Sequence, residues 1–170
     1  PLFRGQTINR TRDFSRNPTA AHEMFHLFQY GYGMFKTGWL LEGMARWSER
    51  FFTSRTPPPP APGRCEDVTG RAYAAASWWA ARWPLAAAAP SVRPLAAARY
   101  AGGAPVIPRL AGVAGGQVRA DLERLARLSV QVSRRLGLPA DAWPEQLQRA
   151  SRHDRELCAA LEQNRPSGAR

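Results

Sequence analysis

A run of prolines divides the chain into two parts. Five of the six residues from 57 to 62 are proline. Proline fixes φ and lacks a backbone N–H, so this density excludes a regular helix or a central strand. We therefore expect a surface connector over residues 56–69. On either side the sequence predicts one unit at residues 1–55, another at 70–163 and a tail at 164–170.

Apolar residues before the connector recur at steps of three and four, which is the period of an α-helix. The pattern predicts one helix over residues 20–30, ended by Gly31 and Gly33, and a second over about residues 39–52. Residues 1–16 hold the only strand-like material. The expected fold class is mainly α, with one or two short N-terminal strands.

The second part also reads as helices separated by glycine and proline. Helices are expected over residues 70–82, where Trp78, Trp79 and Trp83 should pack in the core, and over residues 117–136. Gly137 stands where a C-terminal glycine cap belongs. A single last helix is expected to begin near Pro144 and to carry Leu147, Ala150, Leu157 and Leu161.

The formal net charge of +11 comes almost wholly from arginine, with Lys36 as the only lysine. The arginines are scattered from Arg4 to Arg170, so we do not expect a nucleic-acid interface, which needs clustered basic residues. The sequence contains no stretch of about eighteen uninterrupted apolar residues, so we do not expect a membrane-spanning helix. Cys65 and Cys158 can be two reduced thiols or one disulfide, and we favour the disulfide because we expect export.

The chain contains only three histidines, and two of them lie in the sequence His22-Glu23-Met24-Phe25-His26. Residues four apart lie on the same face of a helix, so both imidazoles can reach one metal ion. A catalytic zinc site takes three protein ligands and leaves a position for water. Glu23 is then the expected general base, because a carboxylate beside a zinc-bound water can take its proton at neutral pH.

Glu42 is the expected third zinc ligand, from the second helix of the first part. Glu49 lies two turns further along that helix, where it can serve an outer-shell role or pair with Arg46. Asp13, before the first helix, can also accept a hydrogen bond from a ligand histidine, since ligand imidazoles usually donate their second N–H to an oxygen.

These motifs together resemble the gluzincin zinc metallopeptidases, the group that includes thermolysin-like and aminopeptidase-N-like enzymes. The resemblance rests on His22-Glu23-x-x-His26 followed by Trp39-x-x-Glu42-Gly43-x-Ala45-x-Trp47-x-Glu49, within residues 19–49, and it is closest to bacterial secreted or surface enzymes of the group. It implies a zincin-like helical domain, zinc ligands at His22, His26 and Glu42, a base at Glu23 and hydrolysis of peptide bonds. The chain departs from the group in its shorter gap between His26 and Glu42, and in Arg46, where thermolysin-like enzymes have an acidic residue.

Members of the group usually carry a tyrosine or histidine that stabilises the oxyanion formed during hydrolysis. Tyr73, Tyr100 and His153 are candidates for that role, and the sequence does not choose among them. His153 also fits a solvated position on a polar helix face.

The sequence thus predicts an exported zinc metallopeptidase, periplasmic, surface-bound or secreted, that acts on a peptide or protein substrate. The alternative is a catalytically inactive zincin-like module in which zinc only joins the two helices. A nucleic-acid binder is a third reading, with salt-dependent affinity that a chelator would not change.

Overall fold

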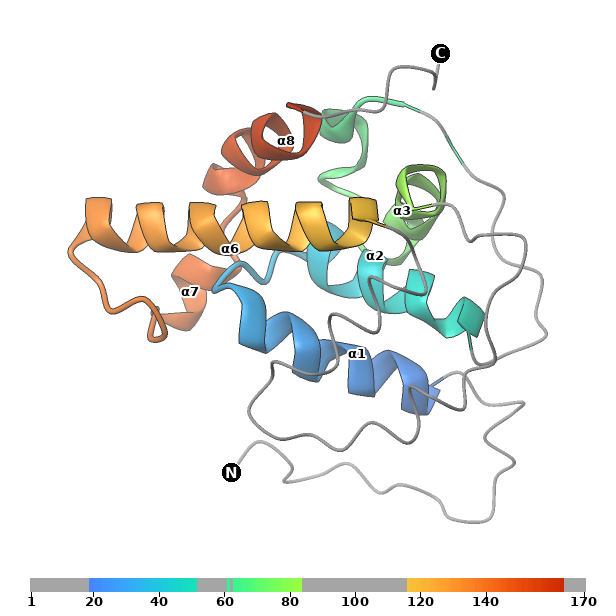
Figure 1. The fold of residues 1–170 in the computed structure, drawn as a ribbon, viewed down its shortest axis with the longest axis horizontal. Coiled ribbons are helices and arrows are strands. Elements are labelled where there is room, and N and C mark those ends of the chain that lie inside the picture. The colour runs from blue at the N-terminus through green and yellow to red at the C-terminus, as the bar shows by residue number, and fades with distance from the viewer. Residues whose placement is uncertain (1–18, 52–60, 62, 84–115, 164–170) are drawn as a thin grey trace.

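The computed structural model describes residues 19–51, 61, 63–83 and 116–163, and the described residues are mainly helical with no strand. The predicted mainly α class is therefore confirmed, while the expected strands in residues 1–16 lie outside the described part. The α-helices are α1 (Thr19–Tyr32), α2 (Gly38–Ser48), α3 (Ala76–Arg82), α6 (Gly116–Leu136), α7 (Glu145–Gln148) and α8 (Asp154–Glu162) (Figure 1). Short 3-10 helices cover Glu49–Phe51, Cys65–Val68, Tyr73–Ala75 and Ser151–His153.

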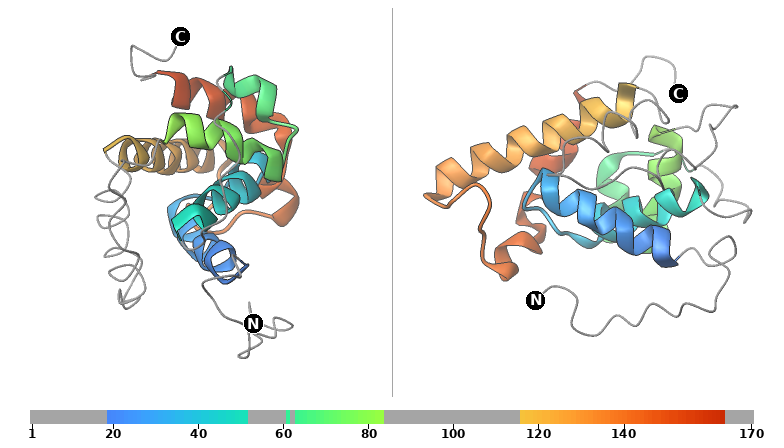
Figure 2. Two further views of the ribbon diagram at one scale, coloured as in Figure 1. Left: turned by 90° about the vertical axis from the view of Figure 1, so that its right-hand side faces the viewer. Right: turned by 60° about the horizontal axis from the view of Figure 1, so that its bottom comes forward.

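Helix α2 lies at the centre of the described structure, with α1 along one side and α3 on the other (Figures 1 and 2). Helix α6, the longest, contacts α1 and packs against α8. Elements from both sides of the proline-rich connector thus share one core. No helix in the described residues is long and apolar enough to cross a lipid bilayer.

Tryptophans of α2 and α3 form the centre of this core, as expected for the second of these helices. Trp39, Trp47, Trp79 and Trp83 are all fully buried. Their indole N–H groups are also satisfied: Trp79 donates to the carbonyl of Trp39 at 3.0 Å, and Trp47 donates to that of Trp83 at 3.2 Å. A buried indole needs such an acceptor, so these bonds hold α3 at one position along α2.

Gly43 allows this close approach. A Cβ at this position would lie 2.9 Å from the Cβ of Ala75 and 3.1 Å from the Trp79 ring. A larger side chain would force the two helices apart. The glycine after Glu42 therefore has a packing role, because it lets the Tyr73–Ala75 segment come against α2 beside the glutamate.

A second polar cluster joins α3, α6 and α8. The carboxylate of Asp121, on α6, is fully buried and accepts five hydrogen bonds of 2.6–3.1 Å, from Arg82, Trp83, Gln117 and Arg124. Arg82 also donates to the carbonyl of Leu161 on α8. Every charge in the cluster meets a partner of the opposite sign or a polar donor.

The expected cap and disulfide are both present. Gly137 has a φ of 65°, and the amides of Gly137 and Leu138 bond back to the carbonyls of Arg134 and Ser133. This pair of bonds is the Schellman ending of a helix. Cys65 lies in the 3-10 helix Cys65–Val68, within the range predicted as a connector, and forms a disulfide with Cys158 of α8.

Three predicted boundaries are wrong. The helix expected over residues 70–82 begins as the 3-10 helix Tyr73–Ala75 and becomes α-helical only in α3, Ala76–Arg82. Helix α1 continues through Gly31 to Tyr32, and the turn to α2 lies at residues 33–37. The single last helix is instead divided into α7, a 3-10 helix and α8, because Ala150 has an extended backbone. The Gln148 carbonyl accepts from the Lys36 amide at 2.7 Å, and this tertiary bond replaces a continuing helical one.

Candidate metal centre

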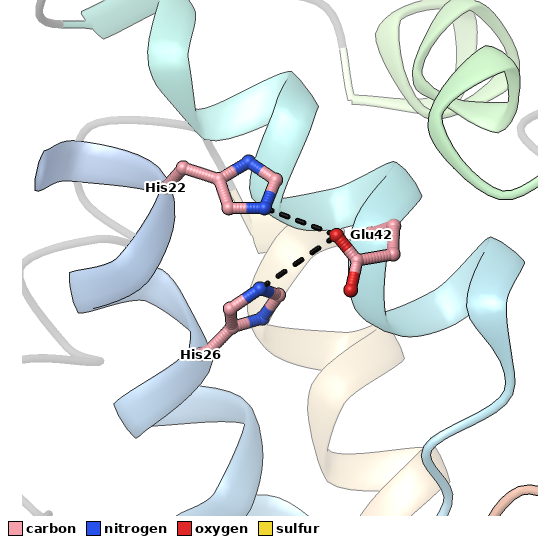
Figure 3. A group of neighbouring side chains, drawn as sticks. All are labelled: His22, His26 and Glu42. Carbon is pink, nitrogen blue, oxygen red and sulfur yellow. Dashed lines mark hydrogen bonds and ion pairs between the residues drawn. The ribbon is translucent and has the colours of Figure 1, made fainter. Parts of the chain in front are cut away.

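His22 and His26 project from adjacent turns of α1 toward Glu42 on α2 (Figure 3). The Nε2 atom of His22 lies 3.1 Å from Oε2 of Glu42, and Nε2 of His26 lies 3.8 Å from the same oxygen. Each of the three side chains offers a ligand atom within 4.8 Å of the other two. The structure thus brings the three expected ligands together, with both histidines buried and Glu42 half-buried.

The hydrogen bond on the other side of His22 sets which of its ring nitrogens carries the proton. Nδ1 lies 3.0 Å from Oε1 of Glu49, which ends α2. A carboxylate only accepts, so Nδ1 is the donor and Nε2 presents its lone pair to the cluster. Arg46 pairs with the second oxygen of Glu49. Glu49 therefore stands in the predicted outer-shell position and in the predicted ion pair.

Gln29 orients the His26 ring in the same way, and the orientation of its own side-chain amide is fixed by two further hydrogen bonds. Its Nε2 donates to the carbonyls of Leu40 and Leu41, each at 3.0 Å. Carbonyls cannot donate, so the nitrogen must face them and Oε1 must face Nδ1 of His26, 2.8 Å away. Nδ1 of His26 then carries the proton, and Nε2 has a free lone pair pointing at the cluster.

In the neutral tautomers that these bonds favour, two imidazole nitrogens and the Glu42 carboxylate face one another. Three such ligand atoms at this spacing could hold one metal ion. Ligand atoms around a tetrahedral zinc lie roughly 3.3 Å apart. The observed spacing and the two imidazoles with one carboxylate fit that ion.

Tyr73 lies at the His22 end of the cluster. Its ring centre is 5.8 Å from that of His22, and its hydroxyl is hydrogen-bonded to Glu42, which, with the charge of that carboxylate, raises the pKa of Tyr73 above 10.0. The side chain is 59% exposed, so the hydroxyl sits at the solvent-facing edge. Of the two oxyanion candidates that the structure describes, Tyr73 and His153, Tyr73 is the one that lies at the cluster.

Glu23 follows His22 on α1 and is half-buried. Its charge adds to the raised pKa values of both Tyr73 and Tyr30, tyrosines that stand at the two ends of the histidine pair. The largest cause of the Tyr30 shift is burial. The charge of Glu23 therefore lies close enough to act on both tyrosines.

His153 does not lie at the candidate metal centre, and the prediction that it is solvated on a polar helix face is also wrong. It is 4% exposed, and its ring contacts are Phe35 and Trp143. The break before α8 turns this residue inward onto those rings. Tyr100 and Asp13 lie outside the described residues.

Sequence reasoning missed Gln29 as part of the site. The signal was available in its spacing, because residue i+3 on a helix lies beside residue i and an amide can accept from an imidazole while donating elsewhere. The carbonyls that fix it belong to α2, and their position could not be read from α1.

Comparisons with protein-family models, curated proteins and solved structures give no match for this chain. The function of the chain is therefore inferred from the chemistry and geometry of the cluster.

Proposed function

We propose that the chain is a zinc-dependent metallopeptidase. The observation that carries the proposal is the meeting of two imidazole lone pairs with the Glu42 carboxylate, while Glu49 and Gln29 hold the other imidazole nitrogens as donors. Two histidines and one glutamate form a ligand set of catalytic zinc, which leaves a coordination position open. The ligands sit in the order His22-Glu23-x-x-His26, then Glu42.

Zinc, when bound, supplies Lewis-acid chemistry that lowers the pKa of a water molecule to about 7 and polarises a carbonyl oxygen. Glu23 takes a proton from the attacking water as its oxygen bonds to the peptide carbonyl carbon. Glu23 then delivers that proton to the amide nitrogen as the C–N bond breaks. One water is consumed, and a carboxylic acid and an amine are released, which then ionise to a carboxylate and an ammonium group.

Tyr73 supports this chemistry as a hydrogen-bond donor. The raised pKa keeps its hydroxyl protonated at neutral pH, so it can donate to the negative oxygen that develops on the substrate carbonyl. Donors aimed at developing charge contribute several kcal/mol, roughly a hundredfold or more in rate. The hydroxyl bonds to Glu42 before substrate arrives and exchanges that partner for the oxyanion.

The disulfide supports a location outside the reducing cytosol. Disulfides persist in periplasmic, surface and secreted proteins and are rare in reducing compartments. Cys65 and Cys158 are joined in this chain. We therefore propose that the enzyme is exported and that it meets peptide or protein substrates there.

The test compares Glu23→Gln with the parent, both loaded with zinc. The variant should keep one zinc ion per chain and lose hydrolysis of a mixed peptide library by roughly 10²–10⁴-fold, the size of a general-base effect. Glu66→Gln is the matched control, because Glu66 is an exposed residue paired with Arg64, and it should leave both readouts unchanged.

Equal hydrolysis by Glu23→Gln and the parent would exclude the mechanism. Zinc binding by a parent that cleaves no peptide, together with a large loss of thermal stability on chelation, would favour the alternative of a structural zinc module.

A further inference from the structure

A row of aromatic rings continues the metal centre along α1. His22, His26 and Tyr30 are each four residues apart, so they share one face of the helix. The two histidine rings are 4.7 Å apart, and Tyr30 stacks on His26 with ring centres 6.2 Å apart. Tyr30 is half-buried, and its ring forms a floor beside the second ligand.

Lys36 places a positive charge over this floor. Its Nζ atom lies 4.5 Å from the centre of the Tyr30 ring, within the range of a cation–π contact. The backbone is fixed there, because the Lys36 amide donates to the Gln148 carbonyl at the end of α7. The only lysine of the chain is thereby held beside the metal centre.

No ion pair joins Lys36 to a carboxylate within the described ranges. The neighbouring cations differ: Arg46 pairs with Glu49, and Arg149 pairs with Glu145 at 3.0 Å. Burial lowers the pKa of Lys36, as does the charge of Arg149, with Glu145 acting in the opposite direction. An aromatic ring compensates an ammonium only in part, so Lys36 keeps donors for a further anionic partner.

The distance between the metal centre and Lys36 suits an extended peptide substrate. Two ring contacts, of 6.2 Å and 4.5 Å, separate the His26 imidazole from the Lys36 ammonium. An extended peptide rises about 3.3 Å per residue. A peptide lying across Tyr30 would therefore reach Nζ about three residues from the bond being cut, or fewer if a long side chain extends toward it.

We propose that Tyr30 and Lys36 form a substrate subsite that binds a carboxylate on the His26 side of the scissile bond. The inference rests on the proposed peptidase function and adds a substrate class, peptides with an acidic group within about three residues of the cleaved bond. The carboxylate belongs to a glutamate or aspartate side chain or to the substrate C-terminus.

The test measures binding, so that it does not depend on turnover. Three peptides of one length are titrated against the zinc-loaded Glu23→Gln chain: one with an internal glutamate and an amidated end, its glutamine counterpart, and the glutamine peptide with a free C-terminal carboxylate. We expect at least one acidic peptide to bind about tenfold more tightly than the neutral one, the size of a partly exposed charge-assisted bond. The arm that binds more tightly identifies the source of the carboxylate.

Adding Lys36→Met should abolish that preference while keeping the apolar stem over Tyr30, and Lys36→Glu should reverse it toward a lysine peptide. Arg127→Met, which removes an exposed cation of α6, should leave the preference intact. Equal affinity for all three peptides, or a preference that survives Lys36→Met, would overturn the subsite. A purely structural Lys36 would lower the unfolding temperature without changing the affinity ratio.

Hydrolysis by the parent chain is measured separately on the same peptides. A parent that binds acidic peptides selectively but cleaves none would contradict the peptidase function and retain the carboxylate site. A parent that cleaves all three peptides equally, without selective binding, would retain the peptidase and overturn the subsite.

Discussion

Two polar clusters in this molecule are each built around a carboxylate, and the carboxylate charge is compensated differently in each. Around Asp121, one carboxylate receives five hydrogen bonds, two of them from Arg82. Around Glu42, one carboxylate faces two imidazole nitrogens and is hydrogen-bonded to the Tyr73 hydroxyl. The Asp121 cluster is paired within the chain, whereas the Glu42 cluster is a group of side chains that could hold a metal ion.

We interpret this difference as one between a structural cluster and a candidate functional one. Buried charges are tolerated when partners of opposite sign and hydrogen bonds satisfy them. The Asp121 cluster meets that condition and joins three helices. The Glu42 carboxylate meets it only in part, through the Tyr73 hydroxyl, while Gln29 and Glu49 orient the two histidines that face it. Such oriented ligand atoms support our proposal that the cluster binds a metal ion.

The largest expected effect comes from breaking the complete cluster. Asp121→Ala leaves Arg82 buried without its partner, which should lower the free energy of unfolding by about 3–5 kcal/mol. Urea unfolding followed by circular dichroism measures the change. Adding Arg82→Leu should restore much of the loss, because it removes the unpaired charge.

An exposed pair gives the control for that prediction. Glu145→Ala removes the partner of Arg149 at the surface and should cost less than about 1 kcal/mol. Equal costs for Asp121→Ala and Glu145→Ala would show that the buried cluster is not the structural centre we infer.

A smaller effect is expected when the support of the metal centre is removed. Gln29→Leu frees the His26 ring to rotate and to shift its proton, so zinc affinity should fall about 10–100-fold. Competition with a chromophoric chelator measures it. Gln131→Leu, an exposed glutamine of α6, is the matched control. Unchanged affinity in Gln29→Leu would mean that the amide does not set the ligand geometry.

The smallest effect concerns pH and His153. Burial lowers the pKa of His153 below its usual 6.5, and Arg152 and Arg135 act in the same direction against Glu156 and Asp154. As pH falls through 6.5, His153 takes up a proton in the unfolded chain but not yet in the folded chain. Stability should therefore decline below that pH.

The check is urea unfolding between about pH 8 and pH 5.5 in the parent and in His153→Leu. This range stays well above the usual pKa of Asp154, which burial raises and which would change stability in the opposite direction. The variant should lose part of the pH dependence. An identical slope in both proteins would contradict the lowered pKa.

The sequence predicted most of the helices and the grouping of His22, His26 and Glu42 because both depend on local spacing. The three- and four-residue period placed α2 and α6 to within a few residues, and Gly137 marked the end of α6. The i, i+4 histidines required a helix, and Glu42 followed on the next one.

What sequence could not supply was set by contacts between distant segments. Lys36 bonds to Gln148 and interrupts the expected last helix, and the approach of Ala75 to Gly43 brings Tyr73 to the metal centre. Gln29 became informative only once the carbonyls of α2 were in place. These features are the ones that convert a ligand motif into an oriented site.

The most direct test of the contrast between the two clusters is a zinc titration of the metal-free chain, with bound metal counted by mass spectrometry. The account predicts one zinc ion per chain, lost in His22→Ala and in His26→Ala and retained in Glu23→Gln. A parent chain that binds no zinc, or histidine variants that bind it as tightly as the parent, would contradict the assignment of His22, His26 and Glu42 as a metal centre.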